Sequence, residues 1–217
     1  MTRAGHGGEG AAPATSAEQA RELEDCVRAG GVAVFPADTV YGLACDPDSP
    51  DAVEQLYALK GRPPDKPAAV LFFSLERALT TLPELEGRLR AAVESLLPGP
   101  VTLLLPNPRR RFAPACGPDR ETLGLRVPGL GGALAALAAV GVPVLQSSAN
   151  LAGGPDARSI QDVPLAMREG ADLVLDGGDL PGTPSTVVDL RDYVASGRWT
   201  VAREGAVTAD EVERRLG

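Results

Sequence analysis

A short apolar run and a polar segment follow each other directly in Val32-Ala-Val-Phe-Pro-Ala-Asp-Thr-Val-Tyr-Gly-Leu43. The first four residues predict a buried strand, which the proline ends because its nitrogen cannot donate to a strand ladder. The segment from Pro36 to Leu43 carries a carboxylate, a hydroxyl and a phenol before a glycine. It is interpreted either as an ordinary turn or as a polar loop at the edge of a sheet, where α/β proteins bind ligands.

Similar apolar runs recur along the chain and are separated by helical patterns. Further strands are predicted at residues 68–73, 101–105, 122–127, 142–145, 171–175, 185–190 and 199–202. Helices are predicted at residues 16–30, 49–60, 85–97, 132–140 and 159–162, and from residues 74 and 208 onward. Because several strands are apolar throughout, we expect helices on both faces of the sheet. The sequence predicts one α/β domain at residues 16–217, after a disordered leader at residues 1–15.

Composition excludes several classes of protein. The formal net charge is −8, which disfavours binding to nucleic acid, and the chain has one histidine. That residue, His6, lies in a glycine-rich segment, so mechanisms that need an imidazole are not expected. The three cysteines are far apart, as is typical of buried thiols in a reducing compartment. The sequence has no apolar run long enough to span a membrane, and we predict a cytoplasmic protein.

Two further segments carry groups that could bind a ligand. Lys60-Gly-Arg-Pro-Pro-Asp-Lys66 places three cations after a predicted helix, which indicates a polyanion site such as one for a nucleotide triphosphate. Its cations could instead meet the helix dipole or be merely solvated. Gln146-Ser-Ser-Ala-Asn-Leu-Ala-Gly-Gly154 follows a predicted strand and offers hydroxyl and amide groups, either to a ligand or to its own turn. No histidine is available to activate a serine nucleophile.

Seven short motifs occur in a characteristic order. They are Pro36-x-Asp-Thr-x-Tyr-Gly-Leu43, Lys60-x-Arg-Pro63, Pro98-Gly-Pro-x-Thr102, Gly124-Leu-Arg-Val-Pro128, Ser148-Ala-Asn150, Pro184-Ser-Thr-Val-Val-Asp189 and Arg203-Glu-Gly205. With these motifs the chain resembles the YrdC-like family of threonylcarbamoyl-AMP synthases, in its short single-domain form. The resemblance covers the chain from about Ser16 to Val207.

The resemblance implies a twisted, mixed parallel and antiparallel sheet, wrapped by helices and enclosing a concave, positively charged cavity. It implies an enzyme that joins L-threonine, bicarbonate or CO2, and ATP into L-threonylcarbamoyl-AMP and pyrophosphate. A separate transferase complex would use this product to modify tRNA, with which the chain itself would make at most a weak contact. Mg2+ is expected to bind chiefly through the phosphates of ATP.

The resemblance also assigns individual residues. The expected ATP contacts are Lys60, Arg62, Thr122, Ser148, Asn150 and Arg203. The expected threonine contacts are Thr39, Lys66, Arg126 and Ser185, of which Arg126 would pair with the carboxylate. No general base is assigned, because two anions have to be neutralised and aligned for this reaction.

The chain departs from the family pattern at a few positions, and two other functions remain open. Ala37 stands where the family usually has threonine, Ser147 replaces a common threonine, Ala152 a common serine, and Arg158 a frequent threonine. The alternatives are a related enzyme that forms a carbamoyl adenylate and a non-catalytic RNA-binding module with the same fold. Few aromatic residues are available for base stacking, which disfavours the second.

Overall fold

The computed structural model describes residues 14–63 and 66–217, so most of the predicted leader lies outside the described residues. The helices are α1 (Ala17–Arg28), α2 (Pro50–Lys60), α3 (Leu75–Thr81), α4 (Gly87–Leu96), α5 (Leu165–Gly170), α6 (Tyr193–Ser196) and α7 (Ala209–Leu216), with 3-10 helices η1 (Gly132–Ala139) and η2 (Ile160–Asp162). The strands are β1 (Ala33–Pro36), β2 (Tyr41–Cys45), β3 (Ala69–Leu71), β4 (Val101–Pro106), β5 (Thr122–Arg126), β6 (Val144–Ser148), β7 (Leu173–Val174), β8 (Thr186–Asp189) and β9 (Thr200–Arg203).

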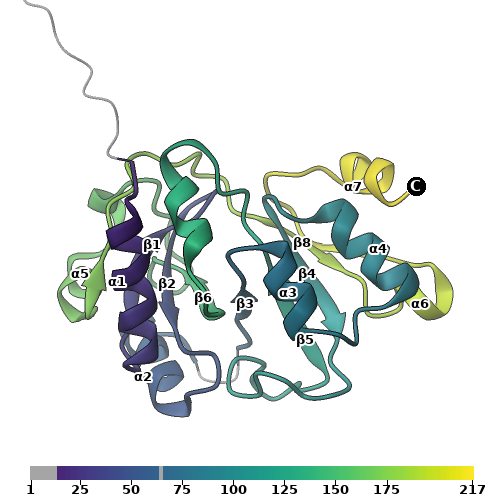
Figure 1. The fold of residues 1–217 in the computed structure, drawn as a ribbon, viewed down its shortest axis with the longest axis horizontal. Helices are drawn as coiled ribbons and strands as arrows, with labels where there is room; N and C mark the ends of the chain where they lie inside the picture. Colours follow the sequence, from purple (N-terminus) through teal and green to yellow (C-terminus); the bar gives the residue numbers. More distant parts are fainter. Residues whose placement is uncertain (1–13, 64–65) are drawn as a thin grey trace, which may run out of the picture.

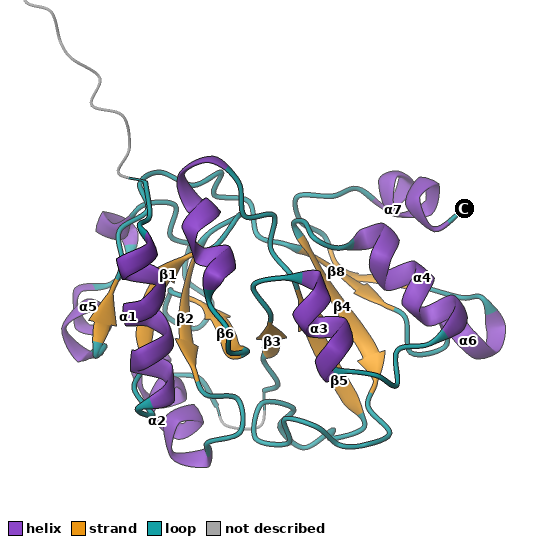
Figure 2. Cartoon of the chain, viewed as in Figure 1, coloured by secondary structure: helices purple, strands orange, loops and turns teal. Residues whose placement is uncertain are grey.

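The described strands form one mixed sheet (Figure 2). Their order is β7-β1-β2-β6-β3-β5-β4-β8-β9. Three neighbouring pairs are parallel, namely β1 with β7, β3 with β5, and β4 with β8, and the other pairs are antiparallel. This confirms the expected α/β fold with a mixed sheet and helices.

The helix boundaries follow local chemistry. At the start of α1, Ser16 and Gln19 form a reciprocal capping box, as the sequence predicts. Helix α2 has Pro50 in its first turn and ends at Gly61, which adopts a left-handed conformation with φ of 60°. This reversal directs the next residue, Arg62, back toward the sheet, where its guanidinium reaches Ser147.

The two halves of the sheet differ in how they are covered (Figure 1). In β1 and β2 every residue is buried. In the half that contains β4 and β5, α3 and α4 lie over one face. On β4, Leu103 and Leu105 are fully buried, whereas Thr102 and Leu104 alternate with them and line a cavity. The expectation of helices on both faces is therefore wrong for this half, because a cavity occupies the second face.

Strand β2 is an element that the sequence analysis interpreted as a loop. Asp38 and Thr39, which precede the strand, and Gly42 within it are typical of turns, yet β2 pairs with both β1 and β6. A Cβ atom at Gly42 would lie 2.8 Å from Gln146 Nε2 and 3.2 Å from Phe35 Cε1. The glycine therefore permits close packing within the sheet, which local sequence patterns do not reveal.

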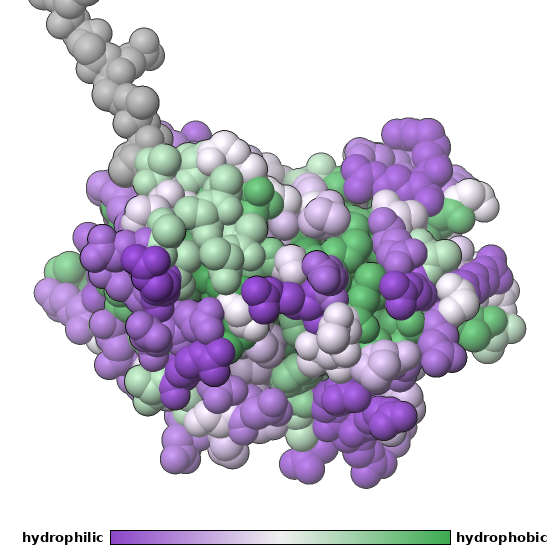
Figure 3. Space-filling model, in the orientation of Figure 1, coloured by the Kyte–Doolittle hydropathy of each residue, from purple (hydrophilic) through white to green (hydrophobic). Residues whose placement is uncertain are grey.

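Other predicted elements are shifted in extent. Strand β6 continues through Ser148, so Gln146 and Ser147 lie within a central strand instead of in the loop that follows it. The predicted helix at residues 132–140 is the 3-10 helix η1, and the surface over it is mainly apolar (Figure 3). Thr15, which the sequence analysis places in the leader, donates from its backbone and its hydroxyl to Ala133 O, both at 2.7 Å.

The structure also describes the three cysteines and the length of the helices, about which the sequence analysis makes predictions. Cys45 and Cys116 are buried and Cys26 is half-buried, and all three are free thiols. In the part of the chain that the structure describes, no helix combines the length and the apolar character needed to cross a bilayer.

Candidate functional site

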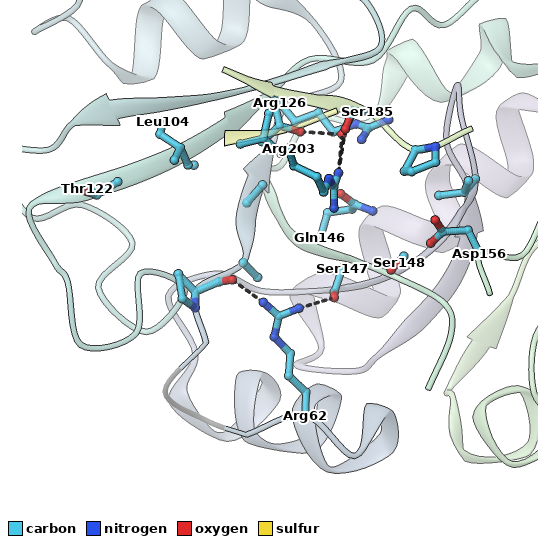
Figure 4. Close-up of a pocket in the computed structure, with 18 of the residues that line it drawn as sticks. Arg62, Leu104, Thr122, Arg126, Gln146, Ser147, Ser148, Asp156, Ser185 and Arg203 are labelled. Atoms are coloured by element: carbon cyan, nitrogen blue, oxygen red, sulfur yellow. Dashed lines mark hydrogen bonds between the residues drawn. The ribbon is translucent and has the colours of Figure 1, made fainter. Parts of the chain in front are cut away.

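The cavity has a volume of about 360 Å³ and lies against β4, β5 and β8 (Figure 4). Its charged lining consists of four arginines and two aspartates, which are Arg62, Arg126, Arg191, Arg203, Asp119 and Asp156. Its neutral lining includes Val40, Pro67, Ala68, Ala69, Thr102, Leu104, Thr122, Gly124, Gln146, Ser147, Ser148, Pro184, Ser185 and Val187. A cavity of this size with a few charged groups over an apolar floor is typical of small-molecule sites.

Arg62 enters the cavity from the turn after α2. Its Nη1 donates to Ser147 Oγ at 3.1 Å and its Nη2 to Pro67 O at 2.5 Å. The guanidinium carbon lies 5.6 Å from the centroid of the Tyr57 ring, within the range of a cation–π contact. Its Nε is buried and has no partner among the described residues. Arg62 is thus held in place, and its buried Nε–H remains without a partner.

Arg126 lies at the end of β5 and is 3% exposed. Its Nη2 donates to Asp38 Oδ1 and to Thr39 Oγ1, both at 2.6 Å. Asp38 also accepts from the backbone N–H of Gly129 at 2.9 Å, so its carboxylate is fixed from two sides. Within the described residues, Arg126 Nε is buried without a partner. The ion pair orients the guanidinium while leaving donor capacity for a ligand.

Arg203 reaches the cavity from the end of β9. Its Nη2 donates to Ser185 O at 2.7 Å and lies 3.4 Å from Ser185 Oγ. The Ser185 hydroxyl also shares a hydrogen bond of 2.8 Å with Thr102 Oγ1, which is buried. Desolvation and the like charge of Arg126 lower the pKa of the Arg203 guanidinium. An anion bound nearby would relieve this repulsion.

Lys60 is oriented toward the loop after β6 and does not line the cavity. It is 4% exposed, and its Nζ donates to Ser148 O at 2.5 Å, Asn150 O at 2.9 Å and Asn150 Oδ1 at 2.7 Å. Burial, and next the positive charge of Arg62, lower the pKa of the Lys60 ammonium to about 8. Its contacts fix the backbone that presents the Ser148 side chain to the cavity.

The residues that the resemblance assigns divide into two groups. Six of them line the cavity, namely Arg62, Thr122, Ser148, Arg203, Arg126 and Ser185. Four do not, namely Lys60, Asn150, Thr39 and Lys66. Lys60, Asn150 and Thr39 support lining residues through hydrogen bonds, whereas the side chain of Lys66 is exposed at the surface.

Several lining residues are absent from the sequence prediction. Thr102 belongs to a motif quoted above, and its alternation with buried leucines on β4 is the signal that could have identified it. Gln146 belongs to the polar segment that was interpreted as a loop. Asp119, Asp156 and Arg191 lie outside the seven motifs and are brought to the cavity only by the folding of their loops. Ala37, the main departure from the family pattern, is buried and is not among the lining residues.

The fold and this site define an α/β protein with an arginine-lined cavity on one face of a mixed sheet. The chain belongs to the Sua5/YciO/YrdC family, described as "Telomere recombination", which it matches over residues 25–205.

Relatives of known name are similar over most of this chain. The threonylcarbamoyl-AMP synthase of Chromohalobacter salexigens is 36% identical over 80% of this chain and 95% of its own length. The threonylcarbamoyl-AMP synthase of Bacillus subtilis is 28% identical over 94% of this chain, which spans 58% of that protein. The crystal structure of Pyrococcus abyssi Sua5 complexed with L-threonine superimposes with a TM-score of 0.77 and 27% identity, over 93% of this chain and 58% of that one.

Proposed function

We propose that this chain is a threonylcarbamoyl-AMP synthase, which forms L-threonylcarbamoyl-AMP and pyrophosphate from L-threonine, bicarbonate and MgATP. The observation that carries the proposal is the presence of Arg62, Arg126 and Arg203 in one cavity, the first two with an unpartnered buried donor and the third with a lowered pKa, which all favour an added anion. The names of the relatives support it. On this proposal, the product serves a tRNA-modifying transferase.

The chemistry requires two anions to meet. The threonine amine attacks bicarbonate, forming a C–N bond and releasing water, to give a carbamate anion. A carbamate oxygen then attacks the α-phosphorus of ATP, and the bond to the bridging oxygen breaks as pyrophosphate leaves. Fixed cations reduce the repulsion between carbamate and triphosphate, which is the main barrier to their approach. The ammonium group of threonine first loses a proton to solvent, so that the neutral amine attacks. The arginines assist by neutralising and aligning the anions, and no side chain is assigned as a general base.

The arginines suit different parts of these substrates. Arg126, which Asp38 and Thr39 hold in place, is assigned to the threonine carboxylate. Arg62, at the side of the cavity formed by Ser147 and Pro67, is assigned to the phosphates. Among residues 14–63 and 66–217, no three His, Cys, Asp or Glu side chains gather as a metal site, and this donor set is compatible with Mg2+ entering as MgATP.

Pyrophosphate release tests the proposal. Purified protein with Mg2+ should release pyrophosphate only when ATP, bicarbonate and L-threonine are all present. Arg62→Ala should lower the affinity for ATP at least about tenfold, since a charge-assisted contact contributes about 1.5–3 kcal/mol. Arg90→Ala, on the outer surface of α4, is the matched control. Release of pyrophosphate without threonine, or tight RNA binding without any release, would contradict the proposal.

A further inference from the structure

Gln146 is a buried polar residue of the cavity that the proposed contacts leave unused. It lies on β6 and is 7% exposed. Its side chain lines the cavity and has no hydrogen bond within residues 14–63 and 66–217, where the unpartnered buried side-chain atoms are Arg62 Nε and Arg126 Nε, so the Gln146 carboxamide is open to the cavity. An amide that is open to a cavity and has no partner in the protein can donate to and accept from a ligand there.

Small residues on the neighbouring strands accommodate the Gln146 side chain. Gly42 on β2 has no side chain, and a Cβ there would lie 2.8 Å from Gln146 Nε2. Ala69 is the direct neighbour of Gln146 on β3. Beyond it, Gly124 on β5 approaches so closely that its Cβ would be 3.1 Å from Ala69 Cα. Small residues on both sides thus make room for the Gln146 side chain against the sheet.

Gln146 lies between two arginines of the cavity, Arg62 and Arg203. Its neighbour Ser147 accepts from Arg62, which is assigned to the phosphates. In Figure 4 the Gln146 side chain is drawn between that pair and the Ser185–Arg203 pair. A neutral amide therefore lies between Arg62, which is assigned to the phosphates, and Ser185, which is assigned to threonine.

We infer that the Gln146 carboxamide binds the carbamate formed on the threonine amino group. The inference rests on the proposed function, and it names the residue that contacts the reacting carbamate of that reaction. A carbamate anion, R–NH–COO⁻, presents an N–H donor beside a carboxylate oxygen. A primary carboxamide presents a C=O acceptor beside an N–H donor, so the two can pair through two parallel hydrogen bonds. An arginine could bind the oxygen but has no acceptor for the N–H.

This pairing distinguishes the carbamate from the free amino acid. The ammonium group of free threonine has no oxygen acceptor beside its N–H donors, whereas bicarbonate has an O–H donor beside an oxygen acceptor and can use the same amide. Gln146 would therefore bind the carboxyl unit from bicarbonate onward and, once the C–N bond has formed, would orient the carbamate oxygen toward the α-phosphorus. Orientation of this kind contributes to the rate of a bimolecular step.

The test replaces Gln146 by an isosteric anion. Gln146→Glu keeps the shape of the side chain but removes the donor and repels the carbamate. We expect the KM for bicarbonate to rise at least about tenfold and kcat to fall, because one charge-assisted hydrogen bond becomes a repulsion. The Kd of ATP alone, and that of L-threonine without bicarbonate, should change less than about twofold. Gln161→Glu, an exposed site that does not line the cavity, is the matched control.

Gln146→Ala provides a second variant that adds no charge, and its KM for bicarbonate should rise less than that of Gln146→Glu. An unchanged KM for bicarbonate in both folded variants would overturn the inference. A weaker Kd for ATP alone, or for threonine without bicarbonate, would also overturn it, because the amide would then contact adenine or the amino acid. Failure of the wild-type protein itself to release pyrophosphate would instead contradict the proposed function.

Discussion

The pair formed by Arg126 and Asp38 shows how one residue fixes the geometry of the site. Both side chains are nearly fully buried, and the N–O distance is 2.6 Å. Burying two charges carries a large desolvation cost, which the ion pair and the added bonds to Thr39 and Gly129 offset. The pair therefore contributes mainly to the orientation of Arg126 and less to net stability.

Removal of Asp38 from its pair with Arg126 should destabilise the folded protein. We expect Asp38→Ala to lower the free energy of unfolding by about 3–5 kcal/mol, because the Arg126 charge stays buried and unpaired. Asp38→Asn, which keeps an acceptor, should lose less. Urea denaturation measures both values. Glu121→Ala removes the exposed Arg110–Glu121 pair and, as the control, should change stability by less than about 1 kcal/mol. Equal effects of Asp38→Ala and Glu121→Ala would refute this account.

At the scale of the element, the contact between the end of β9 and the start of β8 depends on Gly205. A Cβ at this position would lie 2.4 Å from Pro184 O and 2.5 Å from Ser185 C. Both clashes are with backbone, which cannot rotate away as a side chain can. Glycine in the Arg-Glu-Gly motif thus allows the chain to pass directly beneath Ser185.

Gly205→Ala should therefore displace the backbone at Ser185. We expect a loss of about 1–3 kcal/mol in the free energy of unfolding, as is usual for overpacking, together with weaker threonine binding. Gly131→Ala is the control, because nothing lies within 4 Å of its added Cβ. Thermal denaturation and threonine titration report the two effects. Normal threonine affinity in Gly205→Ala would show that Ser185 is not displaced.

The end of α2 and the loop after β6 are joined by Lys60, whose pKa is lowered to about 8. Between a pH of about 8 and about 10.4, the usual pKa of lysine, Lys60 is protonated in the unfolded chain but has lost this proton in the folded chain. The free energy of unfolding should therefore rise with pH in this window, by at most about 1.4 kcal/mol per unit.

The comparison with Lys60→Met isolates this contribution. Burial raises the pKa of Cys45 to about 12, and this thiol acts in the opposite sense at high pH. Urea denaturation at several pH values gives the free energy of unfolding of wild type and of Lys60→Met. The difference between the two should rise with pH by the amount that Lys60 contributes. Lys66→Met, at an exposed site, is the control. A pH dependence identical in wild type and Lys60→Met would contradict the lowered pKa.

At the scale of the whole molecule, a chain of net charge −8 places four arginines in one cavity. The net charge disfavours anions at long range, and we expect the four arginines, which face two aspartates across the same cavity, to attract anions locally. Association with anions should therefore depend on contacts within the cavity, because surface charges are screened beyond about 10 Å at 0.1 M salt.

Inorganic pyrophosphate should consequently raise the melting temperature despite the acidic surface. At one hundred times its Kd, a ligand stabilises the folded state by about 2.7 kcal/mol. Differential scanning calorimetry with increasing pyrophosphate measures the shift, and Arg62→Ala should reduce it. Chloride at equal ionic strength is the control. An equal shift with chloride, or in Arg62→Ala, would mean that the cavity does not bind the phosphates.

Much of the architecture could be predicted from local patterns. Capping residues at Ser16 and Ser49 begin α1 and α2 as expected, and apolar runs mark β3, β4 and β5. The extents of β2 and β6 could not be predicted, because Gly42 and Gln146 are strand residues only through their pairing across the sheet. Local propensity is weak where tertiary pairing determines the structure.

The sequence by itself determined the α/β class, the mixed sheet through its family motifs, and several of the residues around the cavity. Only the tertiary structure decided which of those residues line it. Lys60 supports the loop after β6, whereas Gln146, absent from the predicted contacts, faces the cavity. The physical reason is that a motif records which residues are present, while a side chain's direction depends on strand register and on the partners that folding brings within reach.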